Sequence, residues 1–425
     1  MSPSTPTTDD SLLPAKLHPD APCTPRVKQL PIELIHHVVE LLAEPDRDRR
    51  IPRAWTTCSR VCRTWNRICR HHIFRSILVY ARRDGAVASR LNFLHFTASH
   101  LAEYILDLHL TFHEADLAKV PGWLPDCFKR FKNLRKLHIG CYATLPSPFA
   151  ALQTLGITSL LAAGRIQSFE MESYELIEDD SGLLPILSLC SATLEEVKLR
   201  LCVDRPGVDL ATFPHWKPEP RDQSTVRLDA LRKLDFEEDL PRLHETNRIE
   251  CPNLESLTIT RSNHGPWVIP SWIPASLRGL VLKVSEKLDI PQFVTSIRPS
   301  RLTIEIYKLD RGSYRSVLAW IKDCIDHLPS PNDLRQLTIR IKVYCFHPIK
   351  VFDYPTHEDH QELYRVIEPL HRHGVLERVK LEFATENWRF KPIPTDRTRE
   401  IVTMQEVFAP LLEGGRFAVD TEHWE

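Results

Sequence analysis

Glycine is scarce in this chain, with 13 residues among 425. Enzymes with a Rossmann or P-loop fold place glycines where the backbone must approach a nucleotide phosphate. Neither a GxGxxG nor a GxxxxGKS/T string occurs in the sequence. These absences argue against a nucleotide-dependent enzyme of either class.

Long apolar runs and a targeting segment are also lacking. No stretch of about 18 apolar residues occurs, and the N-terminus has no basic start followed by an apolar run. We therefore expect no membrane-spanning helix and no secretory signal. The 11 cysteines are scattered and odd in number, which favours reduced thiols in the cytoplasm and/or nucleus. A formal net charge of −1 gives the whole molecule no long-range attraction to nucleic acid or acidic membranes.

The first part of the chain changes character near residue 26. Residues 1–25 are rich in proline, serine and threonine, and we expect a disordered tail. The string LPIELIHHVVELL follows, with Pro31 where a first helical turn tolerates proline. Apolar residues then recur at helical spacing, at Ile35, Val38, Val39 and Leu42. This pattern predicts a helix with one apolar stripe.

A second apolar stripe lies in WTTCSRVCRTWNRICRHHIF. Its members, again at helical spacing, are Cys58, Val61, Cys62, Trp65, Ile68 and Cys69. Arginines lie mainly off this stripe. Residues 28–75 therefore predict a small helical unit.

A short string recurs after residue 100: apolar, two variable residues, apolar, one variable residue, apolar. Its copies start at residues 105, 134, 166, 194, 231, 254, 277, 334 and 376, with a degenerate copy at 302–306. The first seven starts are separated by 29, 32, 28, 37, 23 and 23 residues, near the roughly 20–29 residues of a leucine-rich repeat. The alternating half of each string suits a strand, and stacked copies can cover one another's apolar faces.

The predicted fold class is an α/β solenoid, an irregular leucine-rich-repeat array preceded by a small all-α unit. A single such string is common in any α/β protein, but nine copies in order across about 280 residues favour an array. The irregular spacing predicts insertions that bulge as loops near 203–225 and 341–360.

The helical unit resembles the F-box, a docking motif of about 45–50 residues. The resemblance rests on LPxEL at residues 30–34 together with SxVCRxWN at residues 59–66, and it covers about an eighth of the chain. The charged, proline-containing segment at 43–54 is longer than the F-box pattern leads us to expect. The array behind the helical unit resembles that of F-box proteins that many fungi carry.

The resemblance implies a role in ubiquitin ligation. An F-box packs on a Skp-type adaptor, which bridges to a cullin and a RING subunit, and the C-terminal domain presents a protein substrate. Ile35 and Val38 are expected to form an exposed apolar stripe suited to helix-in-groove docking. The predicted adaptor-binding residues are Leu30, Pro31, Glu33, Leu34, Ile35, Val38, Val61 and Trp65.

Positive charge is concentrated beside this unit. Residues 46–90 contain twelve arginines and three aspartates, a sum of +9, so the rest of the chain carries about −10. Such a block can steer an acidic partner, and the resemblance implies that Skp-type adaptors are acidic. Nucleic-acid binding is the alternative, but no aromatic stacking ladder is interleaved with the arginines. A solvated face without a partner stays a further alternative.

Histidine and cysteine clusters suggest catalysis or metal binding, but their patterns do not support it. His357 and His360 share a helical face near acidic residues, yet no HExxH string occurs. Cys58 and Cys62 are spaced C-x3-C without a second pair, which favours core packing. We predict no catalytic residue, no metal and no cofactor; an enzyme with its site in 341–375 is the third hypothesis.

The predicted function is that of a non-enzymatic F-box substrate receptor. The alternative is a leucine-rich-repeat scaffold that takes no part in ubiquitination. Variable strand positions should face the protein substrate, and the predicted substrate-binding residues are Arg135, His138, Lys198, Arg232, Glu255 and Thr258. The chain divides into a disordered tail (1–25), the F-box (26–76), a leucine-rich-repeat-like substrate-binding domain (77–400) and a C-terminal segment (401–425).

Overall fold

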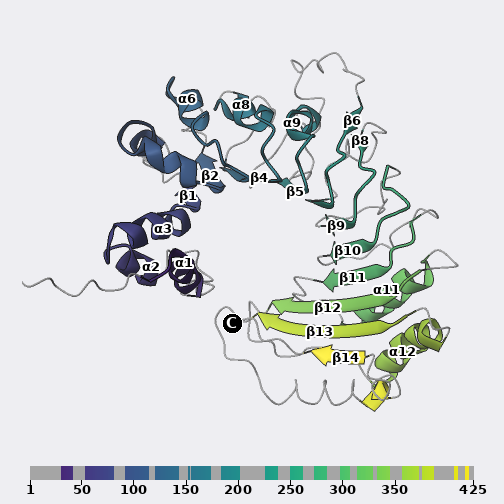
Figure 1. Cartoon of the computed structure of the whole chain (residues 1–425). Helices are drawn as coiled ribbons and strands as arrows, with labels where there is room; N and C mark the ends of the chain where they lie inside the picture. Colours follow the sequence, from purple (N-terminus) through teal and green to yellow (C-terminus); the bar gives the residue numbers. More distant parts are fainter. Residues whose placement is uncertain are drawn as a thin grey trace, which may run out of the picture. The chain divides into compact units, whose positions relative to one another are not determined.

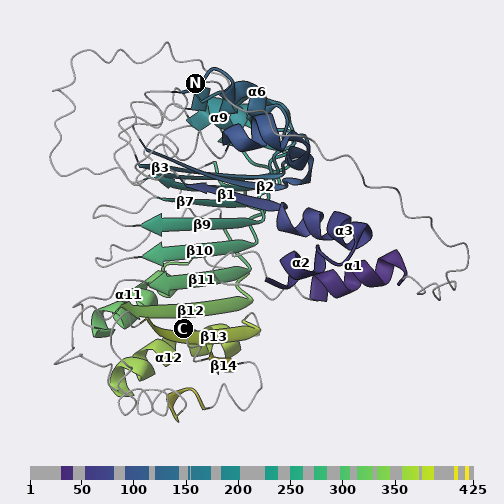
Figure 2. The same ribbon diagram turned by 90° about the vertical axis from the view of Figure 1, so that its left-hand side faces the viewer.

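A computed structural model of the chain separates into two compact units, Met1–Ile73 and Phe74–Glu425. Figures 1 and 2 show the elements of both units. The structure describes residues 30–41, 53–80, 91–113, 120–142, 152–153, 155–173, 183–201, 225–237, 249–261, 272–284, 297–306, 314–328, 333–344, 357–372, 376–386, 406–409 and 417–420. The predicted tail at 1–25 lies outside these ranges.

The first unit contains three helices, α1 (Ile32–Leu41), α2 (Arg53–Cys58) and α3 (Arg63–Ile73). They enclose a small core of buried Ile35, Val39, Ile68 and Cys69, with half-buried Trp55, Cys58, Trp65 and Ile73 packed against it. Parts of the two predicted apolar stripes thus meet across this core, whereas Val38, Val61 and Cys62 of these stripes are exposed. The predicted helical unit over residues 28–75 is confirmed in its described part.

Polar side chains fix how the three helices meet. The indole Nε1 of Trp55 donates a hydrogen bond to the carbonyl of Val39 at 2.8 Å, which ties α2 to α1. Asn66 Nδ2 donates to the carbonyl of Ser59 at 2.9 Å, and Ser59 Oγ donates to the carbonyl of Thr56 at 2.8 Å. These bonds occupy backbone acceptors that the end of α2 would otherwise leave unpaired. The SxVCRxWN string therefore has a structural role in shaping the turn between α2 and α3.

The second unit is built on one open sheet in which every pairing is parallel. Its strands are β1 (Ser76–Tyr80), β2 (Asp107–His113), β3 (Lys136–Tyr142), β4 (Ser168–Ser173), β5 (Glu196–Leu201), β7 (Lys233–Glu237), β9 (Ser256–Arg261), β10 (Gly279–Val284), β11 (Arg301–Ile306), β12 (Gln336–Tyr344), β13 (Arg378–Glu386) and β14 (Phe417–Asp420). They lie in the sheet in chain order, so each strand pairs with the strands before and after it in this series. A separate short ribbon pairs β6 (Val226–Arg227) with β8 (Ile249–Glu250).

The recurring apolar string sets the register of this sheet. From β2 to β13, the second apolar residue of each copy pairs with the second of the next, as Leu108 does with Leu137 and Leu137 with Phe169. The third apolar residues form a parallel row that includes Leu110 and Ile139. Both rows are buried along the described strands, and they form the centre of one continuous core. A slip by one residue would move a whole row from the core to the other face.

Helices cover the apolar face of the sheet, as Figure 1 shows for α6, α8 and α9. The helical elements are η1 (Phe93–Thr97, a π-helix), η2 (Ser99–Tyr104, a 3₁₀-helix), α6 (Leu124–Phe128), α8 (Ile157–Ala162), α9 (Leu183–Cys190), α11 (Tyr314–Asp326) and α12 (His357–Arg372). Their buried apolar residues belong to the same core as the strands. The unit is therefore a mostly parallel sheet with helices on its apolar side.

Polar side chains also connect the turns that lead into successive strands. Asn133 Nδ2 donates to the carbonyl of Glu103 at 2.7 Å, and Asn253 Nδ2 donates to that of Asp229 at 2.8 Å. Each bond runs from the start of one strand to the preceding segment. Such bonds occupy backbone acceptors in irregular chain that would otherwise depend on water. They explain why asparagine stands beside the apolar string in KNLRKL and CPNLESL.

The two predicted insertions and the predicted C-terminal segment can be compared with the structure only where their residues are described. Most of 203–225 and all of 345–356 lie outside the described residues. The predicted loop at 341–360 is wrong at both ends, because 341–344 continue β12 and 357–360 begin α12. Within the C-terminal segment, β14 pairs with β13 and extends the sheet.

None of the described helices combines the length and apolar character that crossing a bilayer requires.

The eight cysteines that the structure describes are free thiols. Six of them are buried, and Cys62 alone among the described ones is exposed. Burial raises the pKa of Cys127 to about 11 and that of Cys190 to about 12. The six buried thiols act as small apolar core residues, as the sequence predicts, but the predicted core packing of Cys62 is wrong, because Cys62 lies exposed in the turn between α2 and α3.

His360 is fully buried on α12, and neither ring nitrogen has a hydrogen-bond partner among the described residues. Burial, with a smaller contribution from His357, lowers its pKa to about 4, and the nearby Asp359 opposes this shift. The folded state therefore holds a neutral imidazole that the unfolded chain protonates below its ordinary pKa. His360 therefore has little effect on the free energy of unfolding above about pH 6.5, and it lowers this free energy as the pH falls towards 4.

We predict that His360→Leu flattens this acid-dependent loss of stability. The loss attributed to His360 between pH 6.5 and 4 is about 3 kcal/mol, because one pKa unit corresponds to about 1.4 kcal/mol. Urea unfolding of the full chain at several pH values measures it. The control His327→Leu replaces an exposed histidine at the end of α11 and should retain the loss. Equal pH slopes for His360→Leu and the wild type would refute this assignment.

Candidate interaction surfaces

The first unit carries a strip of exposed apolar side chains around α1. Leu30 is 53 % exposed, Ile32 40 %, Leu34 49 % and Val38 38 %. Val61, in the turn between α2 and α3, is 65 % exposed. We call Leu30, Ile32, Leu34 and Val38 the α1 strip. Several large apolar residues on one short helix are unusual for a surface that faces only water.

The start of α1 holds this strip in a defined conformation. The carbonyl of Pro31 accepts hydrogen bonds from the backbone N–H groups of Leu34 at 3.1 Å and Ile35 at 3.2 Å. The fixed φ of proline favours this first turn. Leu34 and Val38 are four residues apart, so they lie one above the other on the same side of the helix. The strip is therefore preformed by the local backbone.

Two residues predicted to bind a partner instead contribute to the core of the first unit. Ile35 is only 4 % exposed, so the prediction of an exposed stripe through Ile35 is wrong. The helical spacing of Ile35 and Val39 identifies the buried face, and Leu34 and Val38 lie beside this face, about 100° and 60° around the helix from Ile35. Trp65 is half-buried and packs against that core. Pro31 and Glu33 are exposed beside the strip, and Ile32, which the sequence analysis did not include, belongs to it.

The second surface is the polar face of the sheet, opposite the helices. Side chains alternate along a strand, so residues between the buried positions share this face. Its middle row consists of His109, His138, Glu170, Lys198, Asp235, Thr258, Val281, Thr303, Thr338 and Lys380. The next row towards the strand ends consists of Thr111, Gly140, Glu172, Arg200, Glu237, Thr260, Lys283, Glu305, Arg340 and Glu382.

Acidic and basic side chains on this face pair across neighbouring strands. Arg200 Nη1 donates to Glu172 Oε1 at 2.8 Å. On β12, Arg340 Nη1 donates to Glu305 Oε2 at 3.2 Å, and its Nε donates to Glu382. Glu305 and Glu382 are buried, whereas Arg340 is more open to solvent. The carboxylates of Glu305 and Glu382 thus lie below the surface, and the guanidinium of Arg340 lies nearer to solvent.

His138 is the centre of a partly buried cluster on β2–β4. Its ring stacks on that of His109 with 3.5 Å between centroids. Its Nδ1 lies 3.3 Å from Glu170 Oε2, and its Nε2 lies 3.6 Å from Glu172 Oε2. Burial lowers the pKa of His138, but the two carboxylates outweigh it and the net shift is upward. The cluster favours the positively charged form of His138.

The residues predicted to bind substrate occupy two parallel rows. His138, Lys198 and Thr258 lie in the middle row of the polar face. Arg135, Arg232 and Glu255 lie just before their strands, at the edge where the parallel strands begin. His138, Lys198 and Thr258 lie on every second strand, on β3, β5 and β9, and Arg232 and Glu255 precede neighbouring strands. It also adds Glu170, Glu172 and Arg340, which alternation around the apolar strings could have identified.

Among the residues that the structure describes, no group of three or more His, Cys, Asp or Glu side chains has an arrangement that could hold a metal ion. His360 is buried and His357 is exposed, although both lie on α12.

Residues 27–79 match the F-box-like family model. The match includes all three helices of the first unit and the α1 strip, and it ends within β1. No curated protein matches the chain. The family match supports an F-box protein, and F-box domains generally bind Skp-type adaptors.

We predict that Ile35→Ala and Leu34→Ala affect stability very differently. Ile35→Ala removes buried methyl groups and should destabilise the first unit by about 2–5 kcal/mol. Leu34→Ala removes half-exposed atoms and should change stability by no more than about 0.5 kcal/mol. Hydrogen exchange of the α1 amides in the full chain measures the difference. Equal effects would show that α1 does not divide into a buried and an exposed side.

Proposed function

We propose that this protein is an F-box substrate receptor of a cullin-RING ubiquitin ligase. Its first unit would dock on a Skp-type adaptor, and its second unit would hold a protein substrate. The observation that carries the proposal is the exposed α1 strip, which lies within the segment that matches the F-box-like family.

The α1 strip has the properties that adaptor docking requires. A peptide helix that binds in a groove inserts apolar side chains from one face, and Leu34 and Val38 have that spacing. The core of the first unit is closed by Ile35 and Val39 without these residues. Covering the strip therefore stabilises a complex without rearranging the unit. Exposed Arg60, Arg63 and Arg67 add positive charge that would attract an acidic partner.

The second unit has a regular surface for a protein substrate. We propose that its strings form a leucine-rich-repeat-like array, supported by parallel strands in chain order and by the shared register of the apolar rows. Substrate would contact the polar face through His138, Lys198 and Thr258, and the strand-entry edge through Arg135, Arg232 and Glu255. The array positions these groups about 4.8 Å apart from strand to strand.

In this proposal the protein contributes no chemical step. Holding a substrate lysine near a charged conjugating enzyme raises its effective concentration, which accelerates ubiquitin transfer without an acid, base or nucleophile from the receptor. The buried thiols have raised pKa values, which fits a structural role for them. Free thiols also fit a reducing compartment such as the cytoplasm or nucleus.

We predict that Leu34→Asp or Val38→Asp weakens adaptor binding at least about tenfold, because each buries an unpaired carboxylate in the interface. The measurement is calorimetric titration of the purified full chain with a Skp-type adaptor. Both side chains are exposed, so the variants should keep the wild-type melting curve. Ile35→Asp is unsuitable because it would disrupt the core.

Phe96→Asp is the matched control, because Phe96 is 63 % exposed but lies in the second unit on η1. It should leave adaptor affinity unchanged. A wild-type chain that binds no adaptor, or variants that bind as tightly as the wild type, would favour the alternative: a leucine-rich-repeat scaffold that takes no part in ubiquitination.

A further inference from the structure

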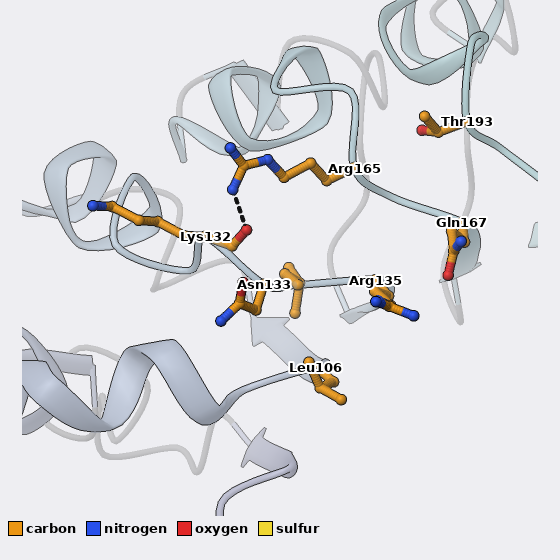
Figure 3. Close-up of a pocket in the computed structure, with 8 residues that line it drawn as sticks. Leu106, Lys132, Asn133, Arg135, Arg165, Gln167 and Thr193 are labelled. Atoms are coloured by element: carbon orange, nitrogen blue, oxygen red, sulfur yellow. Dashed lines mark hydrogen bonds between the residues drawn. The ribbon is translucent and has the colours of Figure 1, made fainter. Parts of the chain in front are cut away.

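A pocket of about 480 Å³ lies at the edge of the sheet where β2–β5 begin. It is lined by Leu106, Lys132, Asn133, Leu134, Arg135, Arg165, Gln167 and Thr193. Figure 3 shows that these residues come from the turns that lead into successive strands. The pocket is therefore bounded by consecutive segments of the second unit.

The walls of this pocket are held by bonds between those turns. Asn133 Nδ2 donates to the carbonyl of Glu103, and Thr193 Oγ1 donates to the carbonyl of Ile166 at 2.9 Å. Arg165 Nη1 donates to the carbonyl of Lys132, which is the bond drawn in Figure 3. This bond uses one of the five N–H groups of the guanidinium.

The residues that line the pocket carry positive charge that no carboxylate in the lining balances. Lys132, Arg135 and Arg165 contribute three positive charges, and no carboxylate lines the pocket. Among the described residues, no carboxylate forms an ion pair with any of these three cations. Nearby Glu195 instead accepts a hydrogen bond from Gln167 Nε2 at 3.3 Å.

Two arginines at equivalent positions elsewhere in the sheet, Arg232 and Arg335, are neutralised. The entry-edge row runs through Arg135, Gln167, Glu195, Arg232, Glu255 and Arg278, joined by backbone hydrogen bonds. Arg232 in this row pairs with Glu255 on the next strand, and Arg335 pairs with Glu377 at 3.5 Å. Arg135 lies between Leu106 and Gln167, neither of which is charged. Arg278 in the same row also has no ion pair among the described residues, so the pocket around Arg135 is distinguished by the three cations that line it together.

We infer that this pocket binds an oxyanion, a phosphate or a carboxylate, through Lys132, Arg135 and Arg165. Planar guanidinium groups match two oxygens of such an anion, whereas the amine of Lys132 extends away from Arg135 in Figure 3 and contributes positive charge to the lining. The cavity exceeds the size of one anion, so it also has room for the group that carries it. This inference is independent of adaptor docking, which involves the first unit.

The test is calorimetric titration of the full chain with inorganic phosphate at low salt. Wild-type protein should bind one phosphate, and Arg135→Gln should weaken binding about tenfold or more. Gln167→Glu keeps every cation but places a carboxylate beside Arg135, imitating the Arg232–Glu255 pair, and should weaken binding to a similar extent. Arg335→Gln is the matched control, because Arg335 holds an equivalent position but pairs with Glu377, and it should leave phosphate affinity unchanged.

Three heptapeptides distinguish the sources of the anion. They are identical except for phosphoserine, glutamate or serine at the centre. Binding of the phosphoserine or glutamate peptide above the serine peptide, lost in Gln167→Glu, identifies a phosphorylated or an acidic polypeptide. Binding of inorganic phosphate alone identifies a small free anion. Absence of phosphate binding to wild-type protein, or equal affinities of wild type, Arg135→Gln and Gln167→Glu, would overturn the inference.

Discussion

The common register of the parallel strands is the constraint on which the second unit depends. Every described strand from β2 to β13 places its apolar residues opposite those of its neighbours, so the buried rows continue across the whole sheet. The same alternation gathers the intervening polar residues on the other face. One packing rule therefore produces both the core and the candidate binding surface. Because each strand contacts only its neighbours, the intervening segments can vary in length without disturbing it.

The first unit has a small helical core, in contrast to the continuous core of the sheet. Its three short helices have few apolar residues, and the core uses one side of α1 through Ile35 and Val39. Leu34 and Val38, which lie beside this buried face, stay in contact with water. Such a helix stabilises its own unit and retains an apolar surface for a partner. The family match over residues 27–79 gives this division of α1 a functional interpretation.

The charged groups of the second unit fall into two environments. On the polar face, buried carboxylates such as Glu305 and Glu382 pair with Arg340, so the surface is largely self-neutralised. At the strand-entry edge, Arg135 has uncharged neighbours. A paired charge must lose its partner before it binds another group, whereas an unpaired one needs only to lose water. Within the described sheet, the entry edge is therefore the better position for recognising an anion.

The sequence by itself determined the strands of the main sheet from β2 to β13, because the recurring string combines strand alternation with a constant apolar spacing, whereas β1 and β14 carry no copy of the string. It also determined the helical unit and its F-box resemblance. Only the tertiary structure decided which side of α1 is buried, because the spacing of Ile35 and Val39 resembles that of Leu34 and Val38, and packing against Ile68 distinguishes them. The uncompensated pocket around Arg135 likewise depends on which residues the register makes neighbours, since Leu106, Arg135 and Gln167 are about 30 residues apart in sequence and adjacent in the sheet.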